Sequence, residues 1–265
     1  MPKISIITVC KDAEQFIELT IQSVISQTYK DYEYIIVDGG STDGTLDIIK
    51  KYEDKVDVFI SEEDKGIYDA MNKGIDLATG EYIIFLNAED YFVNSGILER
   101  VSRMGFNAEL IYGDTLINHR GKLLRKPTGK KIGSFFMFID TIPHQNVFIK
   151  RELYQIVGLH NVKYKIAGDY EFFLRTIFDY GATSEYLNFP LAVNLLTGVS
   201  ADPKNKKITY SERRKAQDKW LYKAPLKFLR IVRPLIIIFY KYPYYLFYII
   251  ASLLSKKYLK IEEAK

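Results

Sequence analysis

The sequence predicts an α/β protein whose mostly parallel central sheet is covered by helices on both faces. Four short apolar runs have the character of buried strands, at residues 4–9, 34–37, 56–60 and 82–86. Three segments between and beside them carry apolar residues at helical spacing, at residues 13–27, 46–52 and 70–78. Because these strands and helices alternate with short loops, we expect parallel pairing and a sheet with two covered faces.

Length, charge and cysteine content narrow the class of protein. A chain of 265 residues can bury a sizeable core, and we expect one large domain followed by a C-terminal appendage. The formal net charge of +4 does not by itself indicate nucleic-acid binding. Cys10 is the only cysteine, which excludes an internal disulfide and a thiolate zinc cluster and fits a reducing compartment. The first ten residues resemble a strand rather than a secretion signal, so we expect a cytoplasmic domain.

Polar side chains follow the predicted strands at the ends where such sheets bind ligands. Asp12 and Glu14 come after the first strand, Asp38 ends the second, and residues 87–90 follow the fourth. Ligands of parallel sheets lie beyond the carboxyl ends of the strands, where loops converge. These side chains are therefore expected at one cleft. After residues 110–112 the pattern is less regular, and we expect antiparallel strands there.

The segment 38–45, Asp-Gly-Gly-Ser-Thr-Asp-Gly-Thr, combines a carboxylate at a strand end with glycines that let the backbone approach a ligand closely. A nucleotide would fit such a site, because Asp38 can accept hydrogen bonds from a base or a ribose. Asp43 has a second interpretation as the cap of the helix that follows.

The segment 87–90, Asn-Ala-Glu-Asp, follows a buried strand. Burying its carboxylates without partners would cost roughly several kcal/mol of free energy. A divalent cation such as Mg²⁺ or Mn²⁺ would offset that cost. The alternative is a solvated turn that caps the next element.

Two further segments carry charged residues at helix starts. Residues 64–74 place Asp69 and Lys73 within about one helical turn. Lys65 and Lys73 would contact a diphosphate, and the alternative is that they form a solvated helix face. Residues 167–175 begin an apolar helix that has Asp169 and Glu171 in its first turn. One of these carboxylates would be a general base, and the alternative is that both are present because the helix dipole favours acids there.

Histidines are few and lie far apart in the sequence. Pro143-His144-Gln145 forms a polar cluster upstream of the helix at 167–175. His119, His144 and His160 are too dispersed to predict a zinc site.

Together these segments resemble a family 2 glycosyltransferase with the GT-A fold, a Rossmann-like fold, over roughly residues 3–220. The matching pieces occur in the family's order and spacing, at residues 7–9 with Asp12 and Glu14, 37–45, 64–74 and 85–90. Residues 143–145 and 167–171 resemble the acceptor-side motifs of bacterial polysaccharide-building members. The resemblance implies a GT-A domain at 1–218, with a donor half at about 1–112 and an acceptor half at about 113–218.

The resemblance implies an inverting hexosyl- or N-acetylhexosaminyltransferase that uses a nucleotide sugar, commonly a UDP-sugar. The acceptor would be a hydroxyl of a glycan or a lipid-linked saccharide in cell-surface polysaccharide synthesis, faced by a loop within residues 121–133. The implied donor-side residues are Thr8, Val9, Glu14, Asp38, Ser41, Lys65, Asp69, Lys73, Asn87 and Ala88. The implied acceptor-side residues are Asp90, His144, Gln145 and Glu171.

Residues 87–89 occupy the family's metal-binding Asp-x-Asp position, with Asn87 in place of the first Asp and Glu89 in place of the second. The resemblance implies that Glu89 binds the Mn²⁺ or Mg²⁺ ion, directly or through water. The family inverts the anomeric centre by single displacement, and its catalytic base aligns with Asp169. Glu171 is the alternative base.

The segment 219–265 is rich in aromatic and basic residues. Its aromatic residues before 250 are Trp220, Tyr222, Phe228, Phe239, Tyr240, Tyr242, Tyr244, Tyr245, Phe247 and Tyr248. Arg233, Pro234, Lys241 and Pro243 interrupt every window long enough to span a membrane. We expect amphipathic helices on the inner face of the cell membrane, and a core-packing helix pair or a contact in a homo-oligomer is the alternative.

Two other functions compete with glycosyl transfer. A sugar nucleotidyltransferase would share the nucleotide-binding α/β domain, but it usually has a glycine-rich basic loop after the first strand, and residues 8–13 contain no glycine. A non-catalytic nucleotide-sugar-binding protein is the other alternative, suggested by the altered Asp-x-Asp position.

Overall fold

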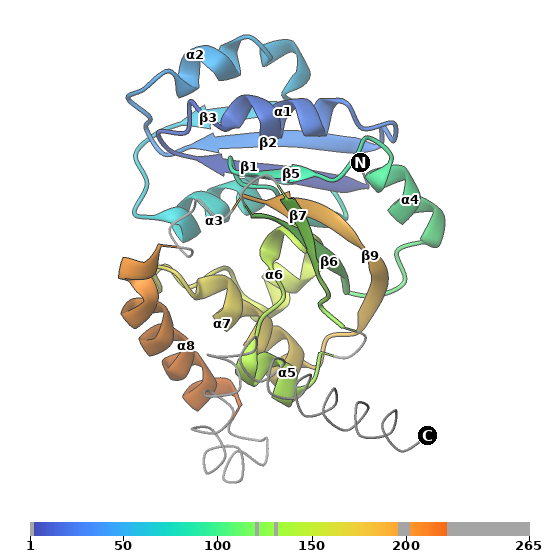
Figure 1. The fold of residues 1–265 in the computed structure, drawn as a ribbon, viewed down its shortest axis with the longest axis vertical. Helices are drawn as coiled ribbons and strands as arrows, with labels where there is room; N and C mark the ends of the chain where they lie inside the picture. Colours follow the sequence, from blue (N-terminus) through green and yellow to red (C-terminus); the bar gives the residue numbers. More distant parts are fainter. Residues whose placement is uncertain (1–2, 120–121, 130–131, 196–201, 222–265) are drawn as a thin grey trace, which may run out of the picture. The chain divides into compact units, whose positions relative to one another are not determined.

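A curled sheet of nine strands organises the residues that the computed structural model describes, which are 3–119, 122–129, 132–195 and 202–221 (Figure 1). The strand order is β3-β2-β1-β4-β8-β6-β9-β5, and β7 pairs with β6. From residue 222 onward, the tail predicted at 219–265 lies outside the described residues.

The first four strands form the parallel part of the sheet. They are β1 (Ile4–Cys10), β2 (Tyr32–Asp38), β3 (Val58–Ser61) and β4 (Tyr82–Phe85). The register places Cys10 beside Asp38 and Asp38 beside Ser61, so the carboxyl ends of β1, β2 and β3 are level. The predicted cleft-forming edge of the sheet is therefore present.

Helices cover both faces of this parallel part. α1 (Ile17–Ile25) and α2 (Thr45–Lys50) lie on one face and α3 (Ile67–Leu77) on the other (Figure 1). A Cβ on Gly74 of α3 would come within 2.5 Å of the Ile7 side chain, so the glycine lets α3 lie directly on β1. All three helices begin or end within a few residues of the positions predicted from apolar spacing.

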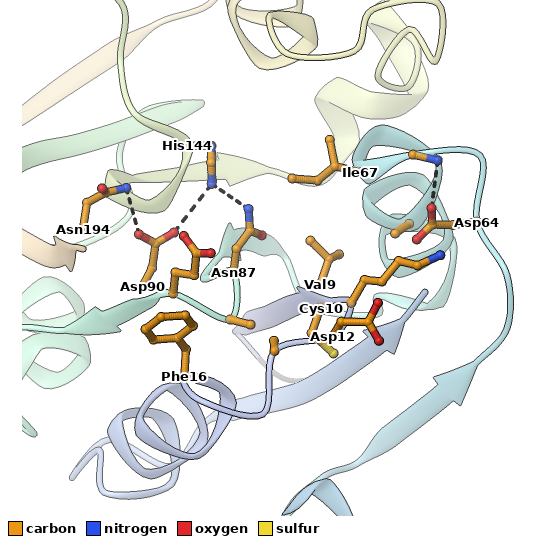
Figure 2. Close-up of a pocket in the computed structure, with 16 residues that line it drawn as sticks. Val9, Cys10, Asp12, Phe16, Asp64, Ile67, Asn87, Asp90, His144 and Asn194 are labelled. Carbon is orange, nitrogen blue, oxygen red and sulfur yellow. Dashed lines mark hydrogen bonds and ion pairs between the residues drawn. The ribbon is translucent and has the colours of Figure 1, made fainter. Parts of the chain in front are cut away.

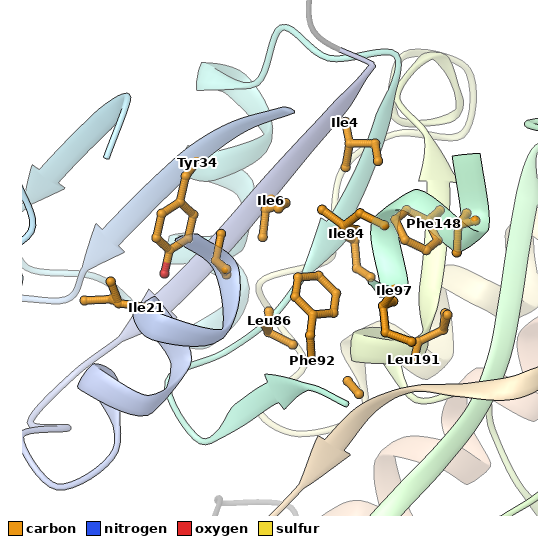
Figure 3. Packing of buried hydrophobic residues seen from close by; sticks show 14 of the residues in the cluster. Ile4, Ile6, Ile21, Tyr34, Ile84, Leu86, Phe92, Ile97, Phe148 and Leu191 are labelled. Atoms are coloured by element: carbon orange, nitrogen blue, oxygen red, sulfur yellow. The ribbon is translucent and has the colours of Figure 1, made fainter. Parts of the chain in front are cut away.

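The main hydrophobic core lies under α1 and α4 (Ile97–Met104). Ile6 and Ile84 from the sheet pack with Ile21 of α1, and Leu191 extends the core toward the second half of the chain (Figure 3). The β-branched residues that fill β1 and β4 suit strands buried on both faces.

The second half of the chain changes the strand direction. Its strands are β5 (Asp90–Phe92), β6 (Leu110–His119), β7 (Lys122–Lys126), β8 (Val147–Lys150) and β9 (Ser184–Asn194). β8 runs antiparallel to β4 and to β6, β7 is antiparallel to β6, and β5 is antiparallel to β9, whereas β6 and β9 are parallel. The antiparallel strands predicted here are confirmed. The expected mostly parallel sheet holds for residues 4–85, whereas the whole sheet is mixed, because among the described strands beyond β4 the β6–β9 pair is parallel and the other pairs are antiparallel.

The remaining helices lie below the curled part of the sheet. They are α5 (Ser134–Ile139), α6 (Glu152–Val157), α7 (Gly168–Leu174), which continues as a π-helix at Arg175–Tyr180, and α8 (Lys206–Trp220). α8 packs against α7 through the buried residues Ala216 and Gln217. Within the described part of the chain, every helix is too short or too polar to cross a bilayer.

Candidate active site

A pocket of about 380 Å³ opens beyond the carboxyl ends of β1 and β4 (Figure 2). Residues 9–13 after β1 and residues 87–90 after β4 form two of its walls. The start of α3 contributes Gly66, Ile67 and Ala70, while His144 and Asn194 come from the second half of the chain. Of the predicted site residues, Val9, Asn87, Ala88, Glu89, Asp90 and His144 line this pocket.

Asp38 lies beside the pocket but does not line it. Its side chain is fully buried, and its carboxylate accepts hydrogen bonds from the Gly40 amide at 3.0 Å, from the Ser41 amide and hydroxyl, and from the Ser61 hydroxyl at 2.7 Å. Burial acts to raise the pKa of Asp38, but the hydrogen bonds from Ser41 and Ser61 outweigh it and lower the pKa. Asp38 and Ser41 thus shape the loop after β2, and a direct contact of either with a nucleotide stays a prediction.

Two loops lock each other beside Asp38, and we call residues 11–14 and 38–45 the rim loops. The Thr42 amide donates to Asp12 at 2.8 Å, and the Gly44 amide donates to Glu14 at 2.9 Å. Asp12 has a φ of 47°, a left-handed conformation that costs a non-glycine residue about 1 kcal/mol or more. These bonds hold Asp12 in that conformation at the wall of the pocket.

Asp43 lies one residue before Gly44, the N-cap of α2, and binds the backbone at the start of that helix. It accepts the Thr45 amide at 3.0 Å in the first turn of α2 and the Glu14 amide at 3.1 Å. Glu14, in turn, is directed at Gly44 and does not line the pocket.

Thr8 is also a structural link in this structure. Its side chain is fully buried, and its hydroxyl donates to the Leu86 carbonyl at 2.7 Å, which joins β1 to the end of β4. Its neighbour Val9 lines the pocket.

The lysines predicted to meet a diphosphate lie outside the pocket lining. Lys73 pairs with the Glu62 carboxylate at 2.8 Å and donates to the Glu63 carbonyl at 3.0 Å. Asp69 accepts the backbone amide of Lys65 at 3.1 Å, at the start of α3. Among the described residues that line the pocket, Lys11 is the one lysine, and the sequence interpretation missed it. Its place directly after β1 was the available signal.

A cluster of four polar residues, which we call the histidine cluster, lies at one end of the pocket, and all of its members except Asp169 line it. It contains Asn87, Asp90, His144 and Asp169. His144 Nε2 lies 3.0 Å from Asn87 Nδ2 and 3.8 Å from Asp90 Oδ2 (Figure 2). Its Nδ1 lies 3.4 Å from Asp169 Oδ2. The structure thus brings together residues from the end of β4, a 3₁₀ turn at His144–Asn146 and the first turn of α7.

The pKa values of the two carboxylates of the histidine cluster are shifted in opposite directions. Burial raises the pKa of Asp90 to about 7, although the nearby His144 lowers it in part. Burial also acts to raise the pKa of Asp169, but the hydrogen bond and charge of His144 and the Tyr170 amide outweigh it, and this pKa is lowered. Asp169 and Asp90 in turn raise the pKa of His144 against the effect of burial. At neutral pH, Asp169 therefore carries the negative charge that a proton acceptor needs.

Two polar side chains support Asp90 from the second half of the chain. Gln145 donates to Asp90 Oδ1 at 3.2 Å and Asn194 donates to the same oxygen at 3.0 Å. Gln145 was predicted on the acceptor side, whereas Asn194 was not predicted at all. Nothing in the local sequence marks Asn194, because only the pairing of β9 with β5 brings it to Asp90.

Glu171 has a different environment from Asp169. It is 2% exposed and absent from the pocket lining, and its carboxylate accepts from Arg175 Nε at 3.1 Å and from Trp220 Nε1 at 2.7 Å. Both of its oxygens are therefore already bonded within the α7–α8 contact.

The chemistry of the pocket suits a divalent cation that a ligand helps to hold. Among the described residues, no group of three or more histidine, cysteine or acidic side chains would bind a metal alone. However, Asn87 Oδ1 is buried without a hydrogen-bond partner, and the Glu89 carboxylate lines the same pocket. Mg²⁺ and Mn²⁺ prefer oxygen ligands, and Mg²⁺ is commonly held by one or two carboxylates together with substrate phosphates and water. These residues fit such an ion.

Comparison with known proteins identifies the family. The model of glycosyl transferase family 2 matches residues 5–174. The chain belongs to glycosyl transferase family 2. A glycosyltransferase of PGL/p-HBAD biosynthesis from Mycobacterium bovis is 31% identical over 202 residues, covering 72% of this chain and 76% of that protein. An uncharacterized glycosyltransferase from Haemophilus influenzae is 29% identical over 181 residues, covering 66% and 71%. This family 2 protein is thus a glycosyltransferase.

Solved structures with low sequence identity share its fold. The S. aureus TarS 1–349 structure in complex with UDP has a TM-score of 0.63 at 19% identity, covering 73% of this chain and 60% of that one. A mannosyltransferase from Pyrobaculum calidifontis in complex with GDP-Man and Mn²⁺ has a TM-score of 0.59 at 15% identity, covering 92% and 82%. The mixed α/β sheet of this family 2 protein is that of the GT-A fold.

Proposed function

We propose that the protein transfers a hexosyl or N-acetylhexosaminyl group, with inversion, from a nucleotide sugar to a hydroxyl of a glycan or lipid-linked saccharide in cell-surface polysaccharide synthesis. The observation that carries this proposal is that Asp169, whose pKa is lowered, is paired with His144, and His144 lines the strand-end pocket. The UDP and UDP-GlcNAc bound to TarS make a UDP-sugar the first candidate, and GDP-Man is the second.

In the proposed reaction, Asp169 acts as the base. The acceptor hydroxyl oxygen forms a bond to the anomeric carbon while the bond from that carbon to the diphosphate oxygen breaks. The electron pair of the broken bond leaves with the nucleoside diphosphate, and the hydroxyl proton passes to the Asp169 carboxylate. Displacement from the opposite side of the sugar inverts the anomeric centre, and no glycosyl-enzyme intermediate is needed.

The donor would lie along the walls formed by residues 9–13 and 87–90. Glu89, with Asn87 Oδ1, would hold a Mn²⁺ or Mg²⁺ ion, which when bound supplies charge neutralisation for the departing diphosphate. Lys11 adds a positive charge in the same pocket and would favour the anionic donor. Asp38 would act on the nucleotide through the shape of the rim loops that it holds together.

The segment 219–265 would hold the enzyme on the inner face of the cell membrane. Its interleaved aromatic and basic side chains support this proposal, since such segments bind anionic lipid headgroups. Truncation after Leu221 should release the protein from sedimenting anionic liposomes. Unchanged sedimentation would contradict the proposal, and a change in oligomeric state on truncation would indicate a subunit contact instead.

A panel of nucleotide sugars tests the proposed function. Nucleoside diphosphate release should occur with one donor class in Mn²⁺ or Mg²⁺ and should stop in the chelator EDTA. A nucleotidyltransferase would instead release pyrophosphate from a nucleoside triphosphate and a sugar 1-phosphate. Donor binding without any turnover in the presence of candidate saccharide acceptors would indicate a non-catalytic binding protein.

A further inference from the structure

The loop that leads into α7 is fixed at its backbone by side chains from two distant elements. Glu212 of α8 accepts the amides of residues 165, 166 and 167 at 2.8, 2.9 and 3.0 Å. Tyr68 of α3 donates its hydroxyl to the carbonyl of Ile166 at 2.6 Å. Four backbone groups of residues 165–167, which are three amides and one carbonyl, are therefore held by side chains from outside the loop. Charge-assisted bonds from a carboxylate to backbone amides are among the stronger hydrogen bonds in proteins.

Tyr68 also reaches the carboxylate itself. Its hydroxyl oxygen lies 3.3 Å from Asp169 Oδ1, and burial raises the pKa of Tyr68 well above its usual value, so the phenol stays protonated. Its single proton is shared between the Ile166 carbonyl, at 2.6 Å, and the more distant Asp169 carboxylate. Its ring fixes the neighbouring backbone as well, because a Cβ on Gly168 would come within 2.7 Å of the ring. Position 168 is therefore restricted to glycine by Tyr68.

The two oxygens of Asp169 have separate partners. Oδ1 accepts the Tyr170 amide at 2.7 Å and lies near Tyr68, whereas Oδ2 faces His144. A small displacement of the loop would change both distances at once. A general base works only within hydrogen-bond reach of the proton it removes, and a misplacement of about 1 Å can cost about 100-fold in rate.

We propose that Tyr68 and Glu212 are positioning residues for Asp169, which act by fixing the loop at residues 165–168. Neither side chain lines the pocket, so both would act on Asp169 rather than on the donor. Tyr68 belongs to α3, and the start of this helix, at Gly66 and Ile67, lines the pocket. α3 therefore contacts both the pocket and, through Tyr68, the loop that carries Asp169. The inference rests on the role proposed above for Asp169.

The experiment compares two conservative variants with two matched controls. Tyr68→Phe removes the hydroxyl and keeps the ring against Gly168, and Glu212→Gln removes the charge and keeps one acceptor oxygen. Tyr210→Phe and Asp218→Asn make the same chemical changes at exposed positions of α8. Turnover is measured with the nucleotide sugar that gives nucleoside diphosphate release in the panel, and donor affinity is measured by calorimetry with UDP and Mn²⁺.

A spectroscopic measurement makes the test independent of turnover. The ring signals of His144, assigned with a His144→Gln variant, report the approach of Asp169 to Nδ1. At fixed pH, Asp169→Asn gives the reference position of these signals without the neighbouring charge. Displacement of the loop should move the His144 signals of Tyr68→Phe and Glu212→Gln toward that reference.

The expected result is a fall in kcat of about tenfold for each test variant, with KM and UDP affinity within about twofold and with shifted His144 signals. Parental kcat and unshifted signals in both variants, while Asp169→Asn has lost turnover, would overturn the inference. Equal losses of UDP affinity, thermal midpoint and kcat would also overturn it, because they indicate a general packing role. Parental turnover in Asp169→Asn would instead refute the proposed base, and the inference with it.

Discussion

The rim loops and the histidine cluster use acidic residues in opposite ways. In the rim loops, Asp38 and Asp43 are bonded to backbone amides and hydroxyls, and these bonds lower the pKa of both. In the histidine cluster, Asp90 and Asp169 face the imidazole of His144, and burial raises the pKa of Asp90 while His144 helps to lower that of Asp169. Backbone amides cannot change charge, whereas an imidazole can. The bonds of the rim loops therefore hold a shape, and we propose that the histidine cluster handles protons.

The largest expected effect is on Asp169. Asp169→Asn should lower the transfer rate by about 10²–10⁴-fold, the usual scale for losing a positioned base, and leave donor affinity nearly unchanged. Transfer kinetics with a true acceptor measure it. Glu171→Gln is the matched control, since it changes a neighbouring carboxylate that is bonded to Arg175 and Trp220. Substantial activity in Asp169→Asn beside an inactive but folded Glu171→Gln would move the base to Glu171.

Removing the carboxylate that holds a rim loop should act on stability first. Asp38→Ala leaves the buried donors of Gly40, Ser41 and Ser61 without their partner, so the free energy of unfolding should fall by about 3 kcal/mol. Urea denaturation measures this change. Asp54→Ala, at an exposed ion pair, should stay within about 0.5 kcal/mol of the parent. If the Asp38→Ala variant were as stable as the parent, the hydrogen bonds to Asp38 would not hold the rim loops, and these loops would not differ from the histidine cluster in the way described.

Asp90 gives a pH-dependent effect of opposite sign, which vanishes at acid pH. Because folding raises the pKa of this acid from 3.8 to about 7, the native state loses stability as pH rises from about 4 to 7 and the loss is complete above that range. Asn cannot ionise and keeps an oxygen for Gln145 and Asn194. Asp90→Asn should therefore be more stable than the parent by about 4 kcal/mol at pH 8 and equal to it near pH 4.

Denaturation curves across that pH range measure the difference. The matched control is Asp76→Asn, at an exposed position of α3, which should show no rise with pH relative to the parent. A constant difference between Asp90→Asn and the parent at all pH values would mean that Asp90 is not a buried ionisable group.

The first half of the fold could be predicted from the sequence because its signals are local. Apolar runs and helical spacing located β1 to β4 and α1 to α3, and the acids that follow β1 and β4 marked two walls of the pocket. The mixed sheet could not be predicted, since β8 pairs with β4 through residues about 65 positions apart in the sequence. No local pattern encodes such a pairing.

The candidate site was predictable in part for the same reason. The segments 87–90, 143–145 and 167–171 each carried polar residues, but only the fold shows that His144 stands between Asp90 and Asp169. Charged residues were harder to interpret, because their partners are not visible in sequence. Lys73 is paired with Glu62, while Lys11 lines the pocket.

Calorimetric titration of UDP in the presence of Mn²⁺ tests most directly the claim that donor binding and proton transfer belong to separate regions. Asp169→Asn should bind UDP as the parent does, within about twofold, because its carboxylate is outside the pocket lining. Glu89→Ala should lose about tenfold in affinity, and the loss should vanish when EDTA replaces the metal. Parental Mn²⁺-dependent binding by Glu89→Ala, or lost UDP binding by Asp169→Asn, would contradict the account.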